Sequence, residues 1–460
     1  MENPIGKGNW MAMDPAVGRM TPPVKTRDVL TGPFFWLSAF YLVYCIRPED
    51  WIPGLSAVPL AKLTAFCATV ALLLSVGKVK RGFRDLPKEA FYLLLLISVL
   101  FLSAVFSPVW KGGAFFRTLD FAKVWVVWVL TYFLITNFER LRHVIFIQSG
   151  SVAVISLVSV IKSHSHPRLE GVLGGIYSNP NDLAFAIVLS LPFCLAFMLS
   201  TKSIPRMVLW ALAMLCMAAA LFLTASRAGF ITLAISGAIC LWHFAVKGRR
   251  PLLIIAVVFI GTALFVLAGK TLKDRFLALS GKGLDTKLET SAYGSFEDRR
   301  FLMLRALEGM EHYPLLGVGT RNFVTYSGVW REVHVSYLQI GVEGGIPALI
   351  LYLLFFGHGF ANLRLLRRMK TLDSQTMLFV GALHSSLIGF TVGACFAPEA
   401  YQFFPYFAVA YTSVLLTIVQ MRETAAPSPT SLPQPVRWRY AYGKDKRGES
   451  EKAGVVTTLR

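Results

Sequence analysis

Blocks of apolar residues separated by short polar turns run through most of the chain. The hydrocarbon core of a bilayer is about 30 Å thick and takes roughly 20 apolar residues of helix to cross. Because no water satisfies the backbone there, such segments must be helical, and the alternation typical of membrane strands is absent from the sequence. The pattern predicts an all-α, polytopic transmembrane bundle of about twelve helices. The predicted spans are 33–46, 57–76, 90–107, 121–137, 143–161, 182–200, 205–223, 228–246, 251–269, 333–357, 377–396 and 400–420.

The composition agrees with a membrane protein. Of the 460 residues, 55% are hydrophobic and only 16% are charged, whereas about a quarter of the residues in soluble domains are charged. The formal net charge is +20, which in a soluble protein would suggest nucleic acid as a partner. In a membrane protein Lys and Arg collect in cytoplasmic loops, so we expect a lipid bilayer and no nucleic acid.

The basic residues also predict an orientation. With the N-terminus inside, the short cytoplasmic loops carry sixteen Lys and Arg and the short outer loops carry eight, which is the usual bias. An even number of helices then places both termini in the cytoplasm. Residues 1–32 are polar and Pro-rich and read as a cytoplasmic segment, not as a cleavable signal peptide. We expect the transmembrane domain over 33–420 and a disordered, basic cytoplasmic tail over 421–460.

The segment 270–332 is the one long outer loop. It carries ten basic residues, and topology does not explain them, because long loops cross the membrane regardless of charge. Within it, 297–312 predicts an amphipathic helix with an apolar stripe. The stripe consists of Phe301, Leu304 and Leu307, with Met310 as a further member.

Arg227 lies between two apolar spans with almost no loop around it. An arginine near bilayer depth costs about 3 kcal/mol on insertion scales. One interpretation is a side chain that snorkels to the outer interface. The other is an anion ligand that faces the interior, with small neighbours such as Gly229 leaving room for a large headgroup.

The turn Asn-Pro-Asn-Asp at 179–182 predicts the start of a helix. Asn181 or Asp182 is expected to cap that helix, and capping alone is a sufficient explanation of the motif. The glycine and amide groups around it, at an outer membrane edge, also suit a sugar or a diphosphate.

His334 opens an apolar span at the end of the outer loop. An imidazole with a pKa near 6.5 suits proton abstraction, although a lone histidine is more often a structural hydrogen-bonding group. Glu343, nine residues further on, is a candidate because carboxylates within a membrane are usually functional. Pairing with a nearby arginine is the alternative.

Arginines of the outer loop form a further candidate site. A guanidinium binds phosphate oxygens with two hydrogen bonds, and a solvated helix face is the alternative explanation. The sequence has no Walker P-loop, no GxSxG and no HExxH motif, and its outer loop lacks the clustered acids of a metal-dependent transferase. We therefore expect neither a metal nor another cofactor. The arginines are Arg299, Arg300, Arg305, Arg321 and Arg331.

Taken together, four motifs resemble the O-antigen ligase and polymerase superfamily, and the resemblance extends from about residue 170 to 420. The order and placement of the motifs carry the resemblance, since each alone is weak. Val335 departs from the family pattern, which often has Asn after the histidine. The motifs are SNPNDLA (178–184), TASRAG (224–229), HYPLLGVGTRNF (312–323) and HVSYLQIGVEGGIPALI (334–350).

The resemblance implies a GT-C-like bundle in the bacterial inner membrane with a periplasmic active site. The donor would be a glycan on undecaprenyl diphosphate, transferred to an acceptor hydroxyl with inversion and without a metal. Arg227 and Arg299 would hold the diphosphate, with Arg300 and Arg321 as further candidates. His334 would be the base that deprotonates the acceptor hydroxyl.

The acceptor remains open at this point. A ligase onto lipid A–core is the leading hypothesis. A polymerase that joins repeat units and a transferase that glycosylates protein share the same fold and donor. A transporter of polyprenyl-linked glycans is the hypothesis from a different class, and it is disfavoured because the sequence lacks the two matching halves typical of transporters.

Overall fold

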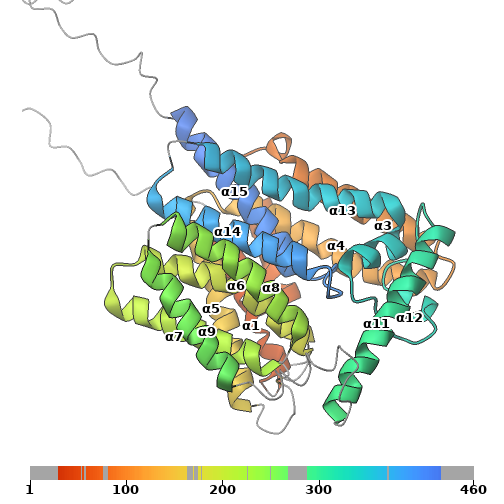
Figure 1. Cartoon of the computed structure of the whole chain (residues 1–460). Helices are drawn as coiled ribbons and strands as arrows, with labels where there is room; N and C mark the ends of the chain where they lie inside the picture. Colours follow the sequence, from red (N-terminus) through yellow and green to blue (C-terminus); the bar gives the residue numbers. More distant parts are fainter. Residues whose placement is uncertain are drawn as a thin grey trace, which may run out of the picture.

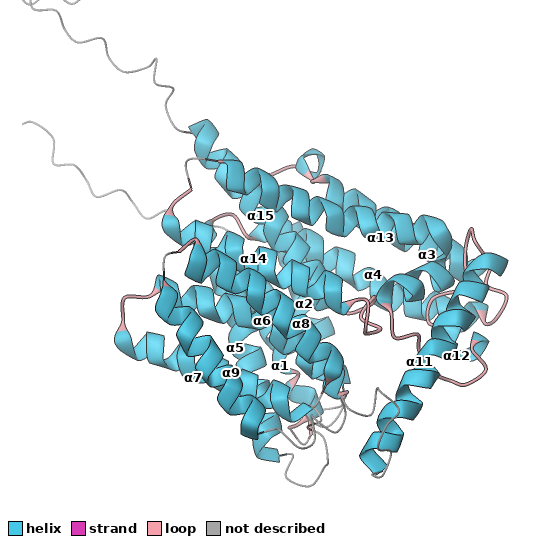
Figure 2. Cartoon of the chain, viewed as in Figure 1, coloured by secondary structure: helices cyan, strands magenta, loops and turns pink. Residues whose placement is uncertain are grey.

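The computed structural model describes most of the chain between residues 30 and 425. The predicted tail from 426 onwards, nearly all of the predicted N-terminal segment and residues 268–286 of the outer loop lie outside the described residues. All regular elements of the described part are helices (Figure 2). The described ranges are 30–52, 54–55, 58–75, 81–162, 169, 175–177, 179–224, 226–248, 250–267, 287–369 and 372–425.

Each predicted apolar span contains a helix, which confirms the all-α, polytopic class (Figure 1). Most helix bounds fall within a few residues of the prediction. The helices of the bundle are α1 (Thr31–Ile46), α2 (Leu60–Leu73), α3 (Lys88–Val105), α4 (Lys111–Leu134), α5 (Phe138–Lys162), α6 (Pro180–Ser200), α7 (Ile204–Thr224), α8 (Arg227–Leu241), α9 (Pro251–Leu267), α13 (Ser336–Arg368), α14 (Ser374–Gly393) and α15 (Phe403–Ala425). Outside the bundle lie α11 (Lys287–His312), α12 (Phe323–Tyr326) and the short turns η1 (Pro48–Asp50), η3 (Phe83–Asp85) and η4 (Gly175–Tyr177). The π-helix η5 (Trp242–Val246) directly continues α8 within the bundle.

Eight helices of the described part are long and apolar enough to cross a membrane. The bundle helices outside this set are α1, α2, α4 and α9. Three of them are short, with 14 to 17 residues, and 16 residues of helix span only about 24 Å. The fourth, α4, carries several charged residues between Lys111 and Lys123. The chain is a multi-pass membrane protein.

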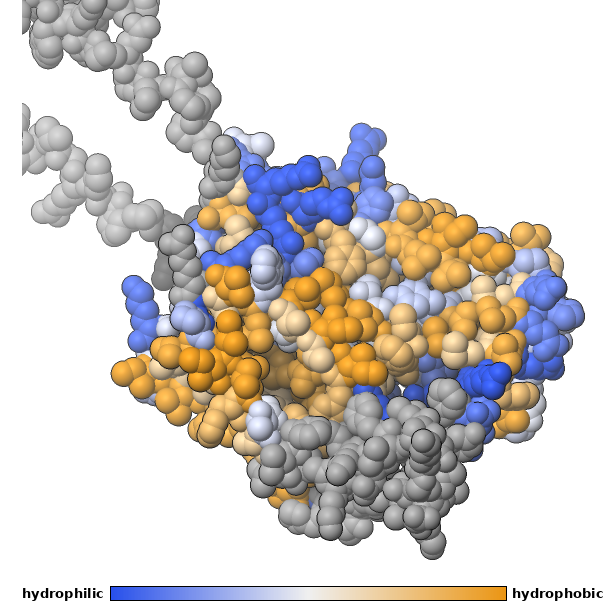
Figure 3. Space-filling model, viewed as in Figure 1, coloured by the Kyte–Doolittle hydropathy of each residue, from blue (hydrophilic) through white to orange (hydrophobic). Residues whose placement is uncertain are grey.

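Burial separates central helices from peripheral ones. In α6 and α15, 78% of the apolar window is buried within the protein, against 28% in α7 and 33% in the span that begins at Arg227. The centre of the bundle is built by α6, which packs on α5, α7, α8 and α14. Figure 3 shows apolar surface over the middle of the molecule, with hydrophilic residues gathered toward its ends.

Successive helices alternate in direction, so α6, α8, α13 and α15 all begin at one end of the bundle. We call this the loop end, because α11 and α12 lie there (Figure 1). The other end is called the opposite end. By the orientation predicted above, the loop end is periplasmic and the opposite end is cytoplasmic.

The helix predicted over 297–312 forms the second half of α11. Of its predicted apolar stripe, Phe301, Leu304 and Leu307 are 49%, 59% and 49% exposed, and Met310 packs against a buried cluster that includes Leu302 and Ala306. The contact face also contains a glycine, because α11 lies close against the first turns of α13. A Cβ atom added to Gly309, for example, would lie 2.6 Å from the side chain of Val342.

Candidate functional site

A break in α13 positions the site. Gly345 has φ 76° and ψ 178° inside the helix, and Pro347 lacks the N–H that would bond to the carbonyl of Glu343. That carbonyl instead accepts hydrogen bonds from the backbone N–H of Gly319 at 3.0 Å and from the hydroxyl of Ser103 at 2.6 Å. The break therefore offers backbone acceptors to which the preceding loop attaches.

Residues 314–322 form this attached loop. The N–H of Val318 donates to a carbonyl of α13 at 2.8 Å. The side-chain amide of Asn322 donates to a hydroxyl and a carbonyl of the turn between α3 and α4. The hydroxyl groups of Thr118 and Thr320 are hydrogen-bonded at 2.7 Å. The loop is thus held between α13 and the α3–α4 turn, which fixes the residue that follows Thr320.

That residue is Arg321, whose backbone has a φ of 55°. Its guanidinium lies over the ring of Tyr401, 6.0 Å from the ring centre. The hydroxyl of Tyr401 donates to the carboxylate of Glu343 at 2.7 Å, and Arg321 is a charged neighbour of the same carboxylate. Glu343 is 1% exposed. The side-chain hydrogen-bond partner of the Glu343 carboxyl is therefore Tyr401, and Arg321 acts on Glu343 through its charge.

His334 lies in the extended segment two residues before α13 and is half-buried. Its ring nitrogen Nδ1 is buried and accepts or donates no hydrogen bond within the described part of the chain. Burial, together with the charges of Arg299 and Arg331, lowers the pKa of His334 from 6.5 to about 4. The imidazole is therefore neutral at pH 7, and its Nδ1 is left without a hydrogen-bond partner among the described residues.

The other loop arginines differ in their surroundings. Arg299 is half-buried on α11 beside His334, whereas Arg300 is exposed. Arg331 pairs with Asp298. Arg305 pairs with Glu308 at 2.6 Å and stacks on a tyrosine ring, so its contacts are those of a solvated helix. Of the two neighbours on α11, the geometry favours Arg299 for a role at His334.

At the start of α6 the predicted cap is wrong. The N-cap is Asn179, whose side chain accepts from the N–H of Asn181 at 2.9 Å, and Pro180 occupies the first helical position. Pro180 needs no hydrogen-bond acceptor there, so the cap falls one residue before it. The side chains of Asn181 and Asp182 consequently serve other contacts.

Asp182 hydrogen-bonds to Glu399, which lies in the turn between α14 and α15. A hydrogen bond between two carboxyl groups requires that one of them be protonated. Burial and the charge of Asp182 raise the pKa of Glu399 well above its usual value, so Glu399 holds the proton. The second oxygen of Glu399, Oε1, is buried without a partner among the described residues.

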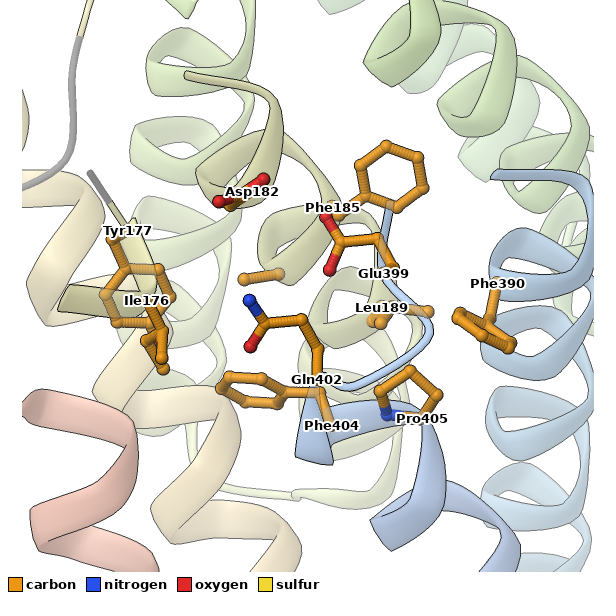
Figure 4. Close-up of a pocket in the computed structure, with 11 residues that line it drawn as sticks. Ile176, Tyr177, Asp182, Phe185, Leu189, Phe390, Glu399, Gln402, Phe404 and Pro405 are labelled. Carbon is orange, nitrogen blue, oxygen red and sulfur yellow. The ribbon is translucent and has the colours of Figure 1, made fainter. Parts of the chain in front are cut away.

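The two carboxyl groups line a pocket at the loop end. Figure 4 shows the carboxyl groups of Asp182 and Glu399 and the amide of Gln402 around a common space, with aromatic rings beside them. The enclosed space is close to the size of one water molecule, so a whole sugar ring does not fit in it. The lining residues are Ile176, Tyr177, Asp182, Phe185, Ala186, Leu189, Phe390, Glu399, Gln402, Phe404 and Pro405.

Arg227 is the first residue of α8 and is half-buried. The preceding residue, Ser226, caps α8 and donates its hydroxyl to the side-chain oxygen of Asn181 at 2.7 Å. A Cβ atom on Gly229 would lie 2.8 Å from Ala184. The small residues around Arg227 thus let α8 approach α6, and they place the arginine beside the start of α6.

The candidate residues form two groups at the loop end. The edge group consists of Arg299, Arg331 and His334. The inner group consists of Asn181, Asp182, Ser226, Arg227 and Glu399. Two charged residues interact electrostatically with the carboxyl groups of this region. Glu332 repels those of Asp182, Glu343 and Glu399, and Arg321 attracts those of Asp182 and Glu343.

Sequence reasoning missed Glu399, Tyr401 and Ser226. Glu399 had a usable signal, because the predicted spans 377–396 and 400–420 leave it in a short outer turn, on the same side of the membrane as Asp182 and His334. Ser226 and Tyr401 carry no comparable signal, since a serine in a tight turn and a tyrosine at a membrane edge are common.

Fold and site together define a multi-pass helical membrane protein with arginine, histidine and carboxyl groups gathered at one end of the bundle. Residues 212–353 match the family model Wzy_C, described as O-antigen ligase. The match supports the O-antigen ligase superfamily and a glycosyltransferase-like enzyme. A search of curated proteins finds no match. Among solved structures, a chain from work on "polymerization and crosslinking by a peptidoglycan synthase complex" is 15% identical, with a TM-score of 0.40, covering 74% of this chain and 98% of that one.

Proposed function

We propose that this protein is an O-antigen ligase-like transferase of the bacterial inner membrane. It moves a glycan from undecaprenyl diphosphate to an acceptor hydroxyl, that of lipid A–core, at the periplasmic face. The single observation that carries the proposal is His334, a neutral, half-buried imidazole whose Nδ1 has no hydrogen-bond partner among the described residues, flanked by arginines at the loop end.

In the proposed reaction His334 accepts the proton of the acceptor hydroxyl. The oxygen then attacks the anomeric carbon from the face opposite the diphosphate, and the bond to the diphosphate breaks with inversion. A positioned base contributes about 10²–10⁴-fold to such a step. A pKa of about 4 makes His334 a weak base in the empty site, and an anionic diphosphate beside the arginines would raise that pKa.

The arginines support the leaving group. Arg299 lies beside His334, Arg321 lies on the loop held by α13, and Arg227 begins α8 at the same end of the bundle. Guanidinium groups fixed before the reaction stabilise a departing diphosphate without the cost of rearranging water. We assign Arg299 and Arg227 to the diphosphate, with Arg321 as a further contact.

The inner group lies at the same end of the bundle as this machinery. The oxygen Oε1 of Glu399 is buried without a partner among the described residues, and a buried acceptor of this kind costs free energy until something bonds to it. The space beside it is close to the size of one water molecule, so a single hydroxyl group is a donor of suitable size.

Deletion in the native host tests the proposal. A ligase predicts lipid A–core without glycan, together with an accumulation of lipid-linked polymer. A single repeat unit on lipid A would indicate a polymerase instead. Intact lipopolysaccharide with a missing protein glycan would indicate a protein glycosyltransferase, and an unchanged surface glycan in all fractions would refute the proposal.

A further inference from the structure

Two histidines and an arginine meet at the opposite end of the bundle, far along the helices from the proposed active site. His243 lies in η5, directly after α8, His384 lies on α14 and Arg367 lies in the last turn of α13. The ring nitrogens His243 Nε2 and His384 Nδ1 are 3.1 Å apart. Arg367 donates from Nη2 to the same nitrogen of His243 at 2.5 Å. All three side chains are half-buried.

The packing around the cluster holds its geometry. A Cβ atom on Gly381 would lie 3.3 Å from the Cβ of His243, so η5 lies directly against α14. The ring of Phe360 meets the edge of His384, with the ring centres 6.1 Å apart. The segment η5 is a π-helix, a wide turn that often marks a functional site.

The charges in this cluster are unbalanced. Among the described residues, the charged groups that act on the two imidazoles are Arg367 and Lys247, and both are cations. At the loop end, by contrast, arginines pair with carboxylates. A guanidinium bonded to His243 also opposes the binding of a metal cation at that nitrogen. Partly buried cations without a counter-charge call for an anion.

The surroundings of the cluster favour a lipid as the source of that anion. Trp242 and Val246, neighbours of His243 in η5, are 52% and 50% exposed, and in this bundle they face the membrane. Lys247 lies over the ring of Trp242, 5.8 Å from the ring centre. Tryptophan and lysine in this arrangement are typical of the interface between the bilayer core and the headgroups.

We propose that His243, His384 and Arg367 bind the phosphate of an anionic phospholipid at the predicted cytoplasmic end of the bundle. Basic pockets between transmembrane helices bind such headgroups in other membrane proteins. The lipid would connect α8, α13 and α14, three of the helices that also build the loop end. The proposal does not depend on the proposed transferase activity.

Native mass spectrometry of the full-length protein tests the proposal. The purified protein is titrated with phosphatidylglycerol, and separately with phosphatidylcholine, whose headgroup has no net charge. We expect retention of phosphatidylglycerol alone, and about a tenfold loss of affinity in Arg367→Gln, the effect of one charge-assisted hydrogen bond. The matched control is Arg364→Gln, which removes the same charge from an exposed position on the same helix and should bind as the wild type does.

Three results would overturn the proposal. The first is equal retention of the two lipids, and the second is equal affinity of the Arg367→Gln and Arg364→Gln variants for phosphatidylglycerol. The third is complete displacement of phosphatidylglycerol by millimolar inorganic phosphate, which would assign the site to free phosphate. If Arg367→Gln does not fold, His384→Asn serves in its place. The asparagine of His384→Asn can still form hydrogen bonds, which favours folding. The His384→Asn protein should bind phosphatidylglycerol more weakly than the Arg364→Gln protein does.

Discussion

The two groups at the loop end differ in how their polar atoms are used. In the edge group, His334 keeps a buried nitrogen without a partner among the described residues, and arginines stand beside it. In the inner group, Asn181 is bonded to Ser226 and Asp182 is bonded to Glu399, and one oxygen of Glu399, Oε1, has no partner among the described residues. Polar groups that are satisfied by the protein hold the fold together, whereas an unsatisfied one calls for a further partner. We therefore expect the proton transfer at the edge group, and at the inner group mainly positioning, with Arg227 as its contact to the diphosphate.

The largest effect is expected for His334→Ala. Loss of the base should reduce glycan transfer by about 10²–10⁴-fold, which in the native host removes the surface glycan. The amount of variant protein in the membrane should stay normal, because the side chain of His334 makes no hydrogen bond through Nδ1 in the described structure. The measurement is gel analysis of lipopolysaccharide with an immunoblot for the protein. Normal glycan would remove His334 as the base.

Arg299 of the edge group and its exposed neighbour Arg300 form a matched pair on α11. Arg299→Ala should lower kcat/KM by about 10–100-fold, the value of one or two charge-assisted hydrogen bonds to the diphosphate. Arg300→Ala removes the same charge from an exposed position and should change kcat/KM by less than about threefold. The assay is transfer by purified protein with a lipid-linked donor. A larger loss in the Arg300 variant would reverse the assignment.

Arg227→Lys tests whether the inner group reaches the diphosphate. An ammonium group keeps the charge but cannot form the two parallel hydrogen bonds of a guanidinium. We expect about a tenfold lower kcat/KM, with an unchanged melting temperature in detergent. Full activity would mean that Arg227 only snorkels to the interface.

We expect Asp182→Ala to lower the stability of the folded protein more than the rate of glycan transfer. The substitution leaves the buried carboxyl of Glu399 without its partner, which costs about 1–3 kcal/mol. Variant protein that remains folded should retain transfer within a few fold. Asp182→Asn is the control, because an amide still bonds to Glu399. A melting temperature equal to that of the wild type, combined with lost transfer, would place Asp182 in the chemistry instead.

The smallest effect concerns pH. Because the pKa of His334 is lowered to about 4, the neutral base is present from pH 5 upward and is lost only as the pH falls toward 4. The kcat/KM of the wild type, which reports the free enzyme, should therefore vary by less than about twofold between pH 6 and pH 8. A fall in kcat/KM toward acid pH with its midpoint near pH 6.5 would show that the surroundings of His334 do not lower its pKa.

Most of the fold was predictable from the sequence, because twenty-residue apolar blocks leave a chain in a bilayer no choice but helix. The bounds that were missed have local causes. The helix α4 begins ten residues before the predicted span, since a helix need not end where its apolar residues end. The stripe of α11 was predicted from residues at helical spacing, but of these only Met310 packs against the buried cluster, whose contact face is set by Leu302, Ala306 and Gly309 on the side toward α13.

The candidate site was predictable only in part. His334 and Arg227 stand out because charged or titratable residues beside apolar spans are costly, whereas Arg299 stood out only as one of several arginines of the outer loop. The contacts between helices are a different matter, since Asp182 and Glu399 meet across more than two hundred residues of chain, and no local pattern encodes their hydrogen bond. The cap of α6 shows the same limit on a smaller scale, because three polar residues of the turn 179–182 could each serve as the cap.

The most direct test of the central claim is single-turnover transfer by purified His334→Ala in the presence of added imidazole. If His334 is the base, the variant should bind the lipid-linked donor normally and transfer the glycan about 10²–10⁴-fold more slowly than the wild type. Imidazole supplied from solution should restore part of that rate, and it should restore nothing to Arg299→Ala. A rate for His334→Ala close to that of the wild type, without imidazole, would contradict the account.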